Sequence, residues 1–285
     1  MTPSVDPRIE IASGTHSGLS RPINEDRFRV IRWHLPGPEG TAATLAVVSD
    51  GIGGNVAGEV AAQIVVDQVC QCLEHSPGLR PLDDLRQCVV AAGRAVAARG
   101  QFEPGLAGMG ATVALAWVLG QRLYITSVGD SRIYLLRARR LRQLSIDHTF
   151  VQEAVERGAL AAAEARNHPY GHVLKQHLGG GADPEPDLRL RLGPRDNDAQ
   201  AKRNQGLRLR AGDTVLLCTD GLSDLVPAAE IGALLGAPDL EAGLAHLIQA
   251  ALARGGTDNV TALALRVADR GGPPRGLRRW LARRG

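Results

Sequence analysis

The chain has 285 residues, of which 44% are hydrophobic and 22% charged, and its formal net charge at pH 7 is +3. This composition is typical of a globular protein, and no apolar run approaches the roughly 20 residues that a membrane-spanning helix requires. The first ten residues lack the basic start and apolar centre of a secretory signal. We therefore expect a cytoplasmic protein with no membrane span, and the modest charge gives no reason to expect a nucleic-acid partner.

The first half of the chain predicts one strand, two helices and then three strands. An apolar run at residues 43–49 predicts a buried strand, and helices are expected from about Gly58 and over residues 82–98, packed as an antiparallel pair. Strand-like runs follow at residues 112–119, 122–128 and 132–137. Their connections are too short for a parallel crossover, so we expect an antiparallel meander.

The second half alternates between loops, helices and strands. Residues 147–158 predict a helix, residues 167–181 an irregular loop, and residues 193–206 a polar, solvated excursion. A strand at 213–219, helices at 228–235 and 240–253, and a last strand at 260–267 complete the pattern. Because no linker or internal repeat divides the chain, we expect one core.

Four cysteines occur in helical or apolar contexts. Cys70 and Cys72 are two positions apart on an expected helix, where their side chains diverge, and Cys88 and Cys218 lie in apolar runs. We expect thiols buried in the core rather than disulfides or zinc ligands.

Aspartates stand at the ends of four predicted strands. Asp50, Asp130 and Asp220 follow apolar runs and adjoin glycines, while Asp258 precedes the last strand beside an asparagine. Each one alone is a common turn residue. Four together indicate a divalent metal site, because a rigid sheet can bring carboxylates from several strand ends to one point.

The glycine-rich stretch at residues 51–58 follows a strand and opens a helix, as a phosphate-binding loop does. A P-loop needs a lysine there, but the only lysines are Lys175 and Lys202, and the dinucleotide fingerprint fails on glycine spacing. Nucleotide binding through this loop is therefore disfavoured.

Seven short motifs lie in order along the chain, at residues 21–26 (RPINED), 49–54 (SDGIGG), 110–112 (GAT), 128–132 (VGDSR), 147–148 (DH), 218–222 (CTDGL) and 256–259 (GTDN). Together they resemble the metal-dependent type-2C protein phosphatases, the PPM family, in their bacterial form. The resemblance implies an α+β fold, a central sandwich of two antiparallel β-sheets flanked by α-helices on both outer faces. We accordingly expect a short head at residues 1–10, a catalytic domain at 11–268 and a basic tail at 269–285.

The resemblance also implies a metal centre. Asp50 would bridge two Mn²⁺ or Mg²⁺ ions, the backbone carbonyl of Gly51 would bind one of them, and Asp220 and Asp258 would complete the ligands of the other. Two such ions would lower the pKa of a bridging water, and the resulting hydroxide would attack phosphorus directly without a phosphoenzyme.

Further roles follow from the same resemblance. Arg21 would bind the phosphoryl group, although it could instead pair with a nearby carboxylate. Glu25 and Asp26 would orient metal-bound waters, with a charged strand edge as the alternative. Asp130 and Asp224 match positions that hold a third, weaker ion, while Asp130 could merely cap its turn.

The chain lacks a histidine that some relatives have beside the metal centre. Ile52 stands where those relatives have a histidine proposed to protonate the leaving group, so that proton must come from elsewhere, such as a metal-bound water. His148 is interpreted as structural, at a helix start. His168, His172 and His177 fall in what resembles the family's mobile flap, where metal binding by them is disfavoured. Such a flap would instead shape access for phosphopeptides.

The basic tail concentrates arginines around Leu277, Trp280 and Leu281. A disordered, solubilising end and an amphipathic segment that docks on an acidic partner or anionic lipid both remain open.

The resemblance thus implies a monomeric protein serine/threonine phosphatase that acts on phosphoproteins and opposes a bacterial serine/threonine kinase. A non-catalytic regulatory or phosphoprotein-binding module and a hydrolase of small phosphate esters are the alternatives. The presence of every expected metal aspartate favours catalysis over the binding module.

Overall fold

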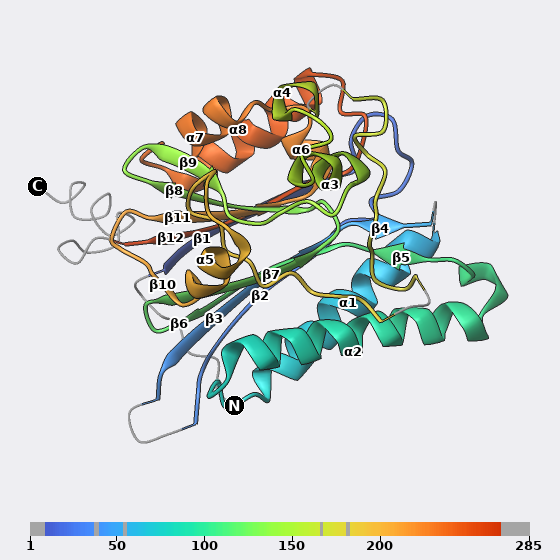
Figure 1. Ribbon diagram of the computed structural model, residues 1–285, viewed down its shortest axis with the longest axis horizontal. Helices are drawn as coiled ribbons and strands as arrows, with labels where there is room; N and C mark the ends of the chain where they lie inside the picture. The colour runs from blue at the N-terminus through green and yellow to red at the C-terminus, as the bar shows by residue number, and fades with distance from the viewer. Residues whose placement is uncertain (1–8, 37–39, 54–55, 166–167, 181–182, 269–285) are drawn as a thin grey trace, which may run out of the picture.

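Two five-stranded antiparallel β-sheets pack face to face at the centre of the computed structural model, which describes residues 9–36, 40–53, 56–165, 168–180 and 183–268 (Figure 1). The first sheet has the spatial order β1 (Ile9–His16), β12 (Val260–Val267), β11 (Thr214–Cys218), β8 (Arg132–Arg137) and β9 (Arg140–Gln143). The second has the order β10 (Leu207–Arg208), β7 (Arg122–Val128), β6 (Val113–Leu119), β3 (Ala42–Ser49) and β2 (Arg27–His34). A small ribbon pairs β4 (Gly51–Ile52) with β5 (Gly110–Ala111).

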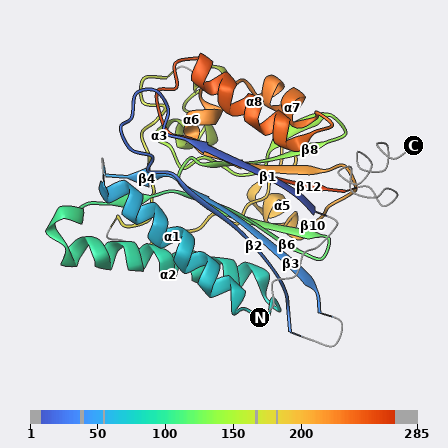
Figure 2. The ribbon, with the colours of Figure 1, turned by 180° about the vertical axis from the view of Figure 1, so that it is seen from behind.

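Helices cover both outer faces of this sandwich. The long helices α1 (Val56–Glu74) and α2 (Pro81–Phe102) lie against the second sheet, while α7 (Ala228–Leu235) and α8 (Leu240–Ala253) lie against the first (Figure 2). The shorter elements are α3 (Phe150–Glu156), α4 (Ala162–Ala165), α5 (Asp198–Arg203), α6 (Asp220–Ser223) and the 3₁₀ turn η1 (Pro104–Leu106). No helix in the described part of the chain is long and apolar enough to cross a membrane. The four-layer architecture expected from the resemblance is confirmed.

Strand β3 shows why the central runs are apolar throughout. Its residues alternate between two fully buried faces: Leu45 and Val47 pack toward α1 and α2, and Ala46 and Val48 pack toward the other sheet. A strand covered on both faces has no polar side, so it reads as a continuous apolar run. A third apolar layer lies between the first sheet and α7 and α8.

Strands β1 and β12 run antiparallel over their whole length. Ile9 lies opposite Val267 at one end of the pair, and His16 lies opposite Val260 at the other. Strand β1 was not predicted from the sequence, and neither was β2. Residues 1–8 of the expected head and the whole expected tail, residues 269–285, lie outside the described residues.

Several predicted elements are confirmed with the bounds given above, namely β7, β8, α7, α8 and β12. The expected meander is wrong in its last step. Strands β6 and β7 pair with each other, but β8 belongs to the other sheet, where it pairs with β9 and β11. The short connection after β7 therefore carries the chain across the sandwich instead of forming a hairpin.

Two local predictions are also corrected. The polar segment at residues 193–206 contains α5, which begins with a reciprocal capping box between Asn197 and Gln200 and buries Ala201. The helix expected over residues 147–158 is the shorter α3, because the side chain of Thr149 caps it by accepting a hydrogen bond from the Gln152 N–H at 3.2 Å.

The prediction of four thiols is wrong for two of them. Cys72 on α1 and Cys88 on α2 form a disulfide, with their Cα atoms 5.6 Å apart. The two helices pack antiparallel, and this brings together residues that are 16 positions apart in sequence. Cys70 and Cys218 are free and buried, as expected.

Candidate metal centre and active site

The registers of both sheets bring the predicted aspartates to the same end of the sandwich. In the first sheet the end of β11 lies beside the starts of β8 and β12, so Asp220, Asp130 and Asp258 are gathered there. In the second sheet the end of β3 lies beside the start of β2, which places Asp50 near Asp26. Strand pairing alone thus collects carboxyl groups from distant parts of the sequence.

The two groups of carboxylates meet across the sandwich. Asp50 interacts electrostatically with Asp220, and it also interacts in this way with Asp26, Asp130 and Asp258. Asp26 is only 2% exposed and accepts a hydrogen bond from the Thr219 hydroxyl at 2.9 Å. The five carboxyl groups therefore share one site.

This site has an excess of negative charge that its own hydrogen bonds do not balance. Burial, and secondarily the neighbouring carboxylates, raise the pKa values of Asp26, Asp50, Asp130 and Asp220 above their ordinary range. Asp26 Oδ1 and Asp220 Oδ1 are buried and accept no hydrogen bond, and the same is true of Glu25 Oε1. Buried oxygen atoms without donors are what hard divalent cations such as Mn²⁺ and Mg²⁺ require, so the residues fit such ions.

Hydrogen bonds from Thr112 hold Asp50 in place. The Asp50 N–H donates to Thr112 Oγ1 at 3.0 Å, and the Thr112 N–H donates back to the Asp50 carbonyl at 2.9 Å. Thr112 Oγ1 is also 2.7 Å from Ser131 Oγ, next to Asp130 in sequence. The GAT motif thus fixes two of the acidic positions relative to each other.

Asn259 is a scaffolding residue whose individual role the sequence did not predict. Its Oδ1 accepts a hydrogen bond from the Glu25 N–H at 2.8 Å, and its Nδ2 donates to the carbonyls of Ser17 and Ile23 at 2.9 and 3.0 Å. Asn259 therefore ties the segment that contains Glu25 to the start of β12. Its place in the GTDN motif, beside Asp258, was the signal in the sequence.

Glycines allow the acidic loops to approach each other closely. A Cβ on Gly221 would lie 2.0 Å from the carbonyl oxygen of Asn259, and a Cβ on Gly51 would lie 2.1 Å from that of Gly58. The glycine after each of Asp50 and Asp220 is therefore required by backbone packing.

Arg21 lies at the exposed rim of the site. Its Nη2 donates to Asp258 Oδ2 at 2.8 Å, and this hydrogen bond raises the pKa of the guanidinium. Arg21 thus contacts one of the predicted metal ligands, and its side chain remains half exposed.

Asp224 lies beside these five carboxyl groups. Burial raises the pKa of Asp224, and its Oδ1 is 3.9 Å from Nη2 of Arg132. His172, from the loop segment at residues 168–180, places its Nδ1 3.1 Å from Asp224 Oδ2. One potential ligand atom from each of His172, Asp220 and Asp224 lies within 4.8 Å of the others. His172 falls in the segment that resembles the family's flap, and its contact with Asp224 could not be predicted from the sequence.

The other two flap histidines bond locally. His168 Nδ1 accepts the N–H of Tyr170 at 3.2 Å, and His177 Nδ1 lies 3.1 Å from the Leu178 carbonyl oxygen. The fold and the convergent carboxylates agree with the family resemblance seen in the sequence. Residues 22–257 match the family model described as "Protein phosphatase 2C". The chain therefore belongs to the protein phosphatase 2C family.

Named relatives are serine/threonine phosphatases. PstP of Mycobacterium tuberculosis is 36% identical over 261 residues, which are 92% of this chain and 45% of PstP, so the chain spans slightly less than half of that relative. Stp of Listeria monocytogenes is 30% identical over 224 residues, 77% of this chain and 82% of Stp. A crystal structure of the PstP catalytic domain in complex with two manganese ions is 34% identical, has a TM-score of 0.72 and covers 92% of this chain and 99% of its own.

Gly221→Ala should lower the free energy of unfolding by about 2 kcal/mol, because the new Cβ overlaps the Asn259 carbonyl and one loop must move. Chemical denaturation measures this change. Gly105→Ala is the matched control, since a Cβ there meets nothing within 4 Å. Equal effects of the two substitutions would contradict the close approach.

The metal-free protein should lose stability as pH rises from about 4 to 8. Folding raises the pKa of Asp220 to about 6, of Asp26 to about 7 and of Asp130 to about 8, so the folded state binds protons that the unfolded state releases above about pH 4. The stabilising contribution of these groups is complete below the unfolded pKa and disappears as pH passes the folded values.

Mn²⁺ should therefore increase the thermal midpoint more at pH 8 than at pH 5, because it replaces these protons. Differential scanning fluorimetry with and without Mn²⁺ measures the difference. Asp50→Asn should stabilise the metal-free protein at pH 8 and reduce the Mn²⁺ increment. An increment independent of pH would contradict this account.

Proposed function

We propose that the chain is a metal-dependent phosphatase that hydrolyses phosphoserine and phosphothreonine on proteins. The observation that carries this proposal is the convergence of five acidic side chains, in four of which burial and neighbouring carboxylates raise the pKa, so that cations would stabilise their ionised form. The named relatives and the two manganese ions in the PstP crystal structure support it. Two Mn²⁺ or Mg²⁺ ions held by Asp50, the Gly51 carbonyl, Asp220 and Asp258 would supply an activated water near neutral pH.

Arg21 is the proposed phosphate-binding residue. Its guanidinium stands at the exposed rim beside Asp258, and its planar fork can donate to two phosphoryl oxygens at once. Glu25 and Asp26 are proposed to orient water. Each has a buried carboxylate oxygen without a donor, which can accept a hydrogen bond from a water molecule at the site.

Asp130 and Asp224 are proposed to hold a third, weaker ion. Asp130 is 8% exposed and lies in the electrostatic range of both Asp220 and Asp224. His172 contacts Asp224 from the loop segment above, so this corner of the site is shared between a carboxylate pair and a flap side chain.

The proton for the leaving group does not come from the position that some relatives use. Ile52 occupies it, and an aliphatic side chain has no proton to give. His148 does not replace it, because its ring nitrogens face Gly129 and Asp187.

The proposal includes the partners expected from the sequence. The substrates are phosphoproteins, and the enzyme opposes a bacterial serine/threonine kinase in the cytoplasm, acts as a monomer and has no nucleic-acid partner. A binding module without catalysis is disfavoured, because such a module has no need of five converging carboxyl groups.

Asp50→Asn or Asp220→Asn should abolish hydrolysis of a phosphothreonine peptide, because each removes a charged ligand from the cation site. A chelator should have the same effect on the wild type, and Mn²⁺ should reverse it. Release of inorganic phosphate measures activity. Asp239→Asn is the control, since asparagine also serves as the α8 N-cap. Full turnover in chelator would dismiss the metal mechanism.

Arg21→Ala should reduce kcat/KM for the phosphopeptide about 30-fold, the size expected for a lost charge-assisted hydrogen bond pair. Mn²⁺ affinity, measured by calorimetry, should not fall, because the substitution frees Asp258 from its partner. Arg254→Ala removes a comparable surface pair with Glu230 and should leave kinetics unchanged. If Arg21→Ala has wild-type kinetics, Arg21 forms a surface ion pair with Asp258 and does not bind the phosphoryl group.

A further inference from the structure

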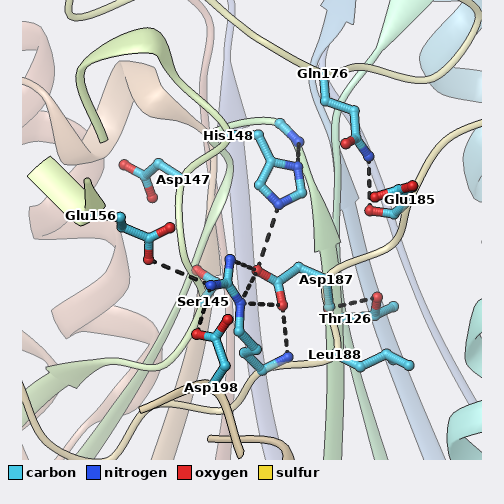
Figure 3. Close-up of polar contacts among 12 residues, drawn as sticks. Thr126, Ser145, Asp147, His148, Glu156, Gln176, Glu185, Asp187, Leu188 and Asp198 are labelled. Atoms are coloured by element: carbon cyan, nitrogen blue, oxygen red, sulfur yellow. Dashed lines mark hydrogen bonds and ion pairs between the residues drawn. The ribbon is translucent and has the colours of Figure 1, made fainter. Parts of the chain in front are cut away.

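A polar network is centred on His148 and Asp187 (Figure 3). His148 makes two hydrogen bonds to a single residue of the turn between β7 and β8. Its backbone N–H donates to the Gly129 carbonyl at 2.8 Å, and its Nδ1 accepts the Gly129 N–H at 3.3 Å. Because Nδ1 accepts a hydrogen bond, the ring proton of the neutral side chain is on Nε2, which lies 3.7 Å from Asp187 Oδ2.

The turn held by His148 carries the acidic site. Gly129 directly precedes Asp130, and the next residue, Ser131, contacts Thr112, which in turn bonds the backbone of Asp50. A shift of Gly129 would therefore move Asp130 and disturb the support of Asp50. A residue that never touches a metal ion can in this way set the geometry of its ligands.

Asp187 is a rigid anchor for the His148 ring. It exchanges two backbone hydrogen bonds with Ser127, at 3.0 and 3.3 Å, and Thr126 Oγ1 donates to its carbonyl at 3.0 Å. Arg189 donates to both carboxylate oxygens through Nε and Nη2. Burial alone would raise the pKa of Asp187, but the contacts with His148 and Arg189 lower it to about 2. The anchor is therefore ionised and fixed to β7 just before the Gly129 turn.

His148 also lies where the flap segment returns to the body of the protein. Its carbonyl accepts the Lys175 N–H at 2.8 Å, and the neighbouring Phe150 N–H donates to the Val173 carbonyl at 2.9 Å. The flap residue His172 directly precedes Val173 and reaches Asp224. One residue thus joins the Asp130 turn, the Asp187 anchor and the base of the flap.

We propose that His148 is a positioning residue of the metal centre, whose Nδ1 holds the Gly129 N–H so that Asp130 stays aimed at the other carboxylates. Asp187 keeps the ring in the tautomer that leaves Nδ1 free to accept. The inference rests on the proposed function for its catalytic consequence, but the positional role belongs to the folded chain itself.

Two substitutions distinguish the roles of the two ring nitrogens. His148→Asn keeps an acceptor near Nδ1 and loses the donor toward Asp187. His148→Gln keeps a donor near Nε2 and loses the acceptor for Gly129. His148→Ala loses both, and all three retain the backbone hydrogen bonds.

Mn²⁺ binding and kcat should fall only in the variants that lose the acceptor at Nδ1. His148→Gln and His148→Ala should weaken Mn²⁺ binding and lower kcat for the phosphopeptide by about tenfold, whereas His148→Asn should stay within about twofold of the wild type. KM should change little, since the residue does not contact substrate. Calorimetry with Mn²⁺ and steady-state kinetics measure these effects on the full chain.

Amide hydrogen exchange of the metal-free protein gives an independent measurement. The Gly129 amide should exchange faster in His148→Gln and His148→Ala, and at the wild-type rate in His148→Asn. Thermal midpoints provide the control for a merely structural role. His148→Asn and His148→Gln each lose one contact, so similar thermal midpoints with different Mn²⁺ affinities would separate positioning from stability.

The proposal is overturned if His148→Gln keeps the wild-type exchange rate at Gly129, or if the losses in Mn²⁺ affinity and kcat follow the thermal midpoints of the variants. Failure of the proposed function would look different. The wild type would then release no phosphate from any phosphoprotein, while the exchange pattern would still decide the role of His148.

Discussion

Electrostatic repulsion among carboxyl groups at one end of the sandwich is the constraint on which this structure depends. Asp26, Asp50, Asp130 and Asp220 come from four separate strand ends, and burial raises the pKa of each. A fold that buries several acids together must either keep them protonated or supply positive charge. Divalent cations would satisfy this requirement and, as proposed above, would make the cluster a reactive centre.

The rest of the site resists that repulsion with neutral hydrogen bonds and close backbone contacts. The Thr112 hydroxyl accepts the Asp50 N–H and the Thr219 hydroxyl donates to Asp26. Asn259 joins two loops, and Gly221 allows two backbone segments to approach closely. These residues are uncharged, so they fix the carboxylates without neutralising them. The cluster is thus preorganised, and cations bound there would not have to draw the carboxylates together.

Much of this arrangement could be predicted from the sequence, for identifiable reasons. The apolar runs of β7, β8 and β12 and the helical spacing of α8 are strong local signals, and an aspartate beside a glycine at a strand end marks a candidate ligand. The four-layer architecture was predicted from the family resemblance. The apolar patterns could not show that β8 joins the other sheet, because a short connection allows either a hairpin or a crossing of the sandwich.

The contacts that were missed depend on tertiary structure. Cys72 and Cys88 meet because two helices pack side by side, and His172 reaches Asp224 because a loop folds back over the site. The spacing of these residues in the sequence does not indicate either contact. Helix α5 was missed for a different reason, since its capping residues are polar and its segment resembles a solvated loop.

The pairing of β1 with β12 also determines where neighbouring sequence can be attached. Ile9 and Val267 lie opposite each other at one end of these eight-residue strands, and the acidic site lies beyond the other end, where His16 faces Val260. Strands of this length span about 25 Å. A reporter domain or purification handle fused before β1 or after β12 would join the sandwich at the end remote from the acidic site, so a bulky fusion there should not cover the aspartates.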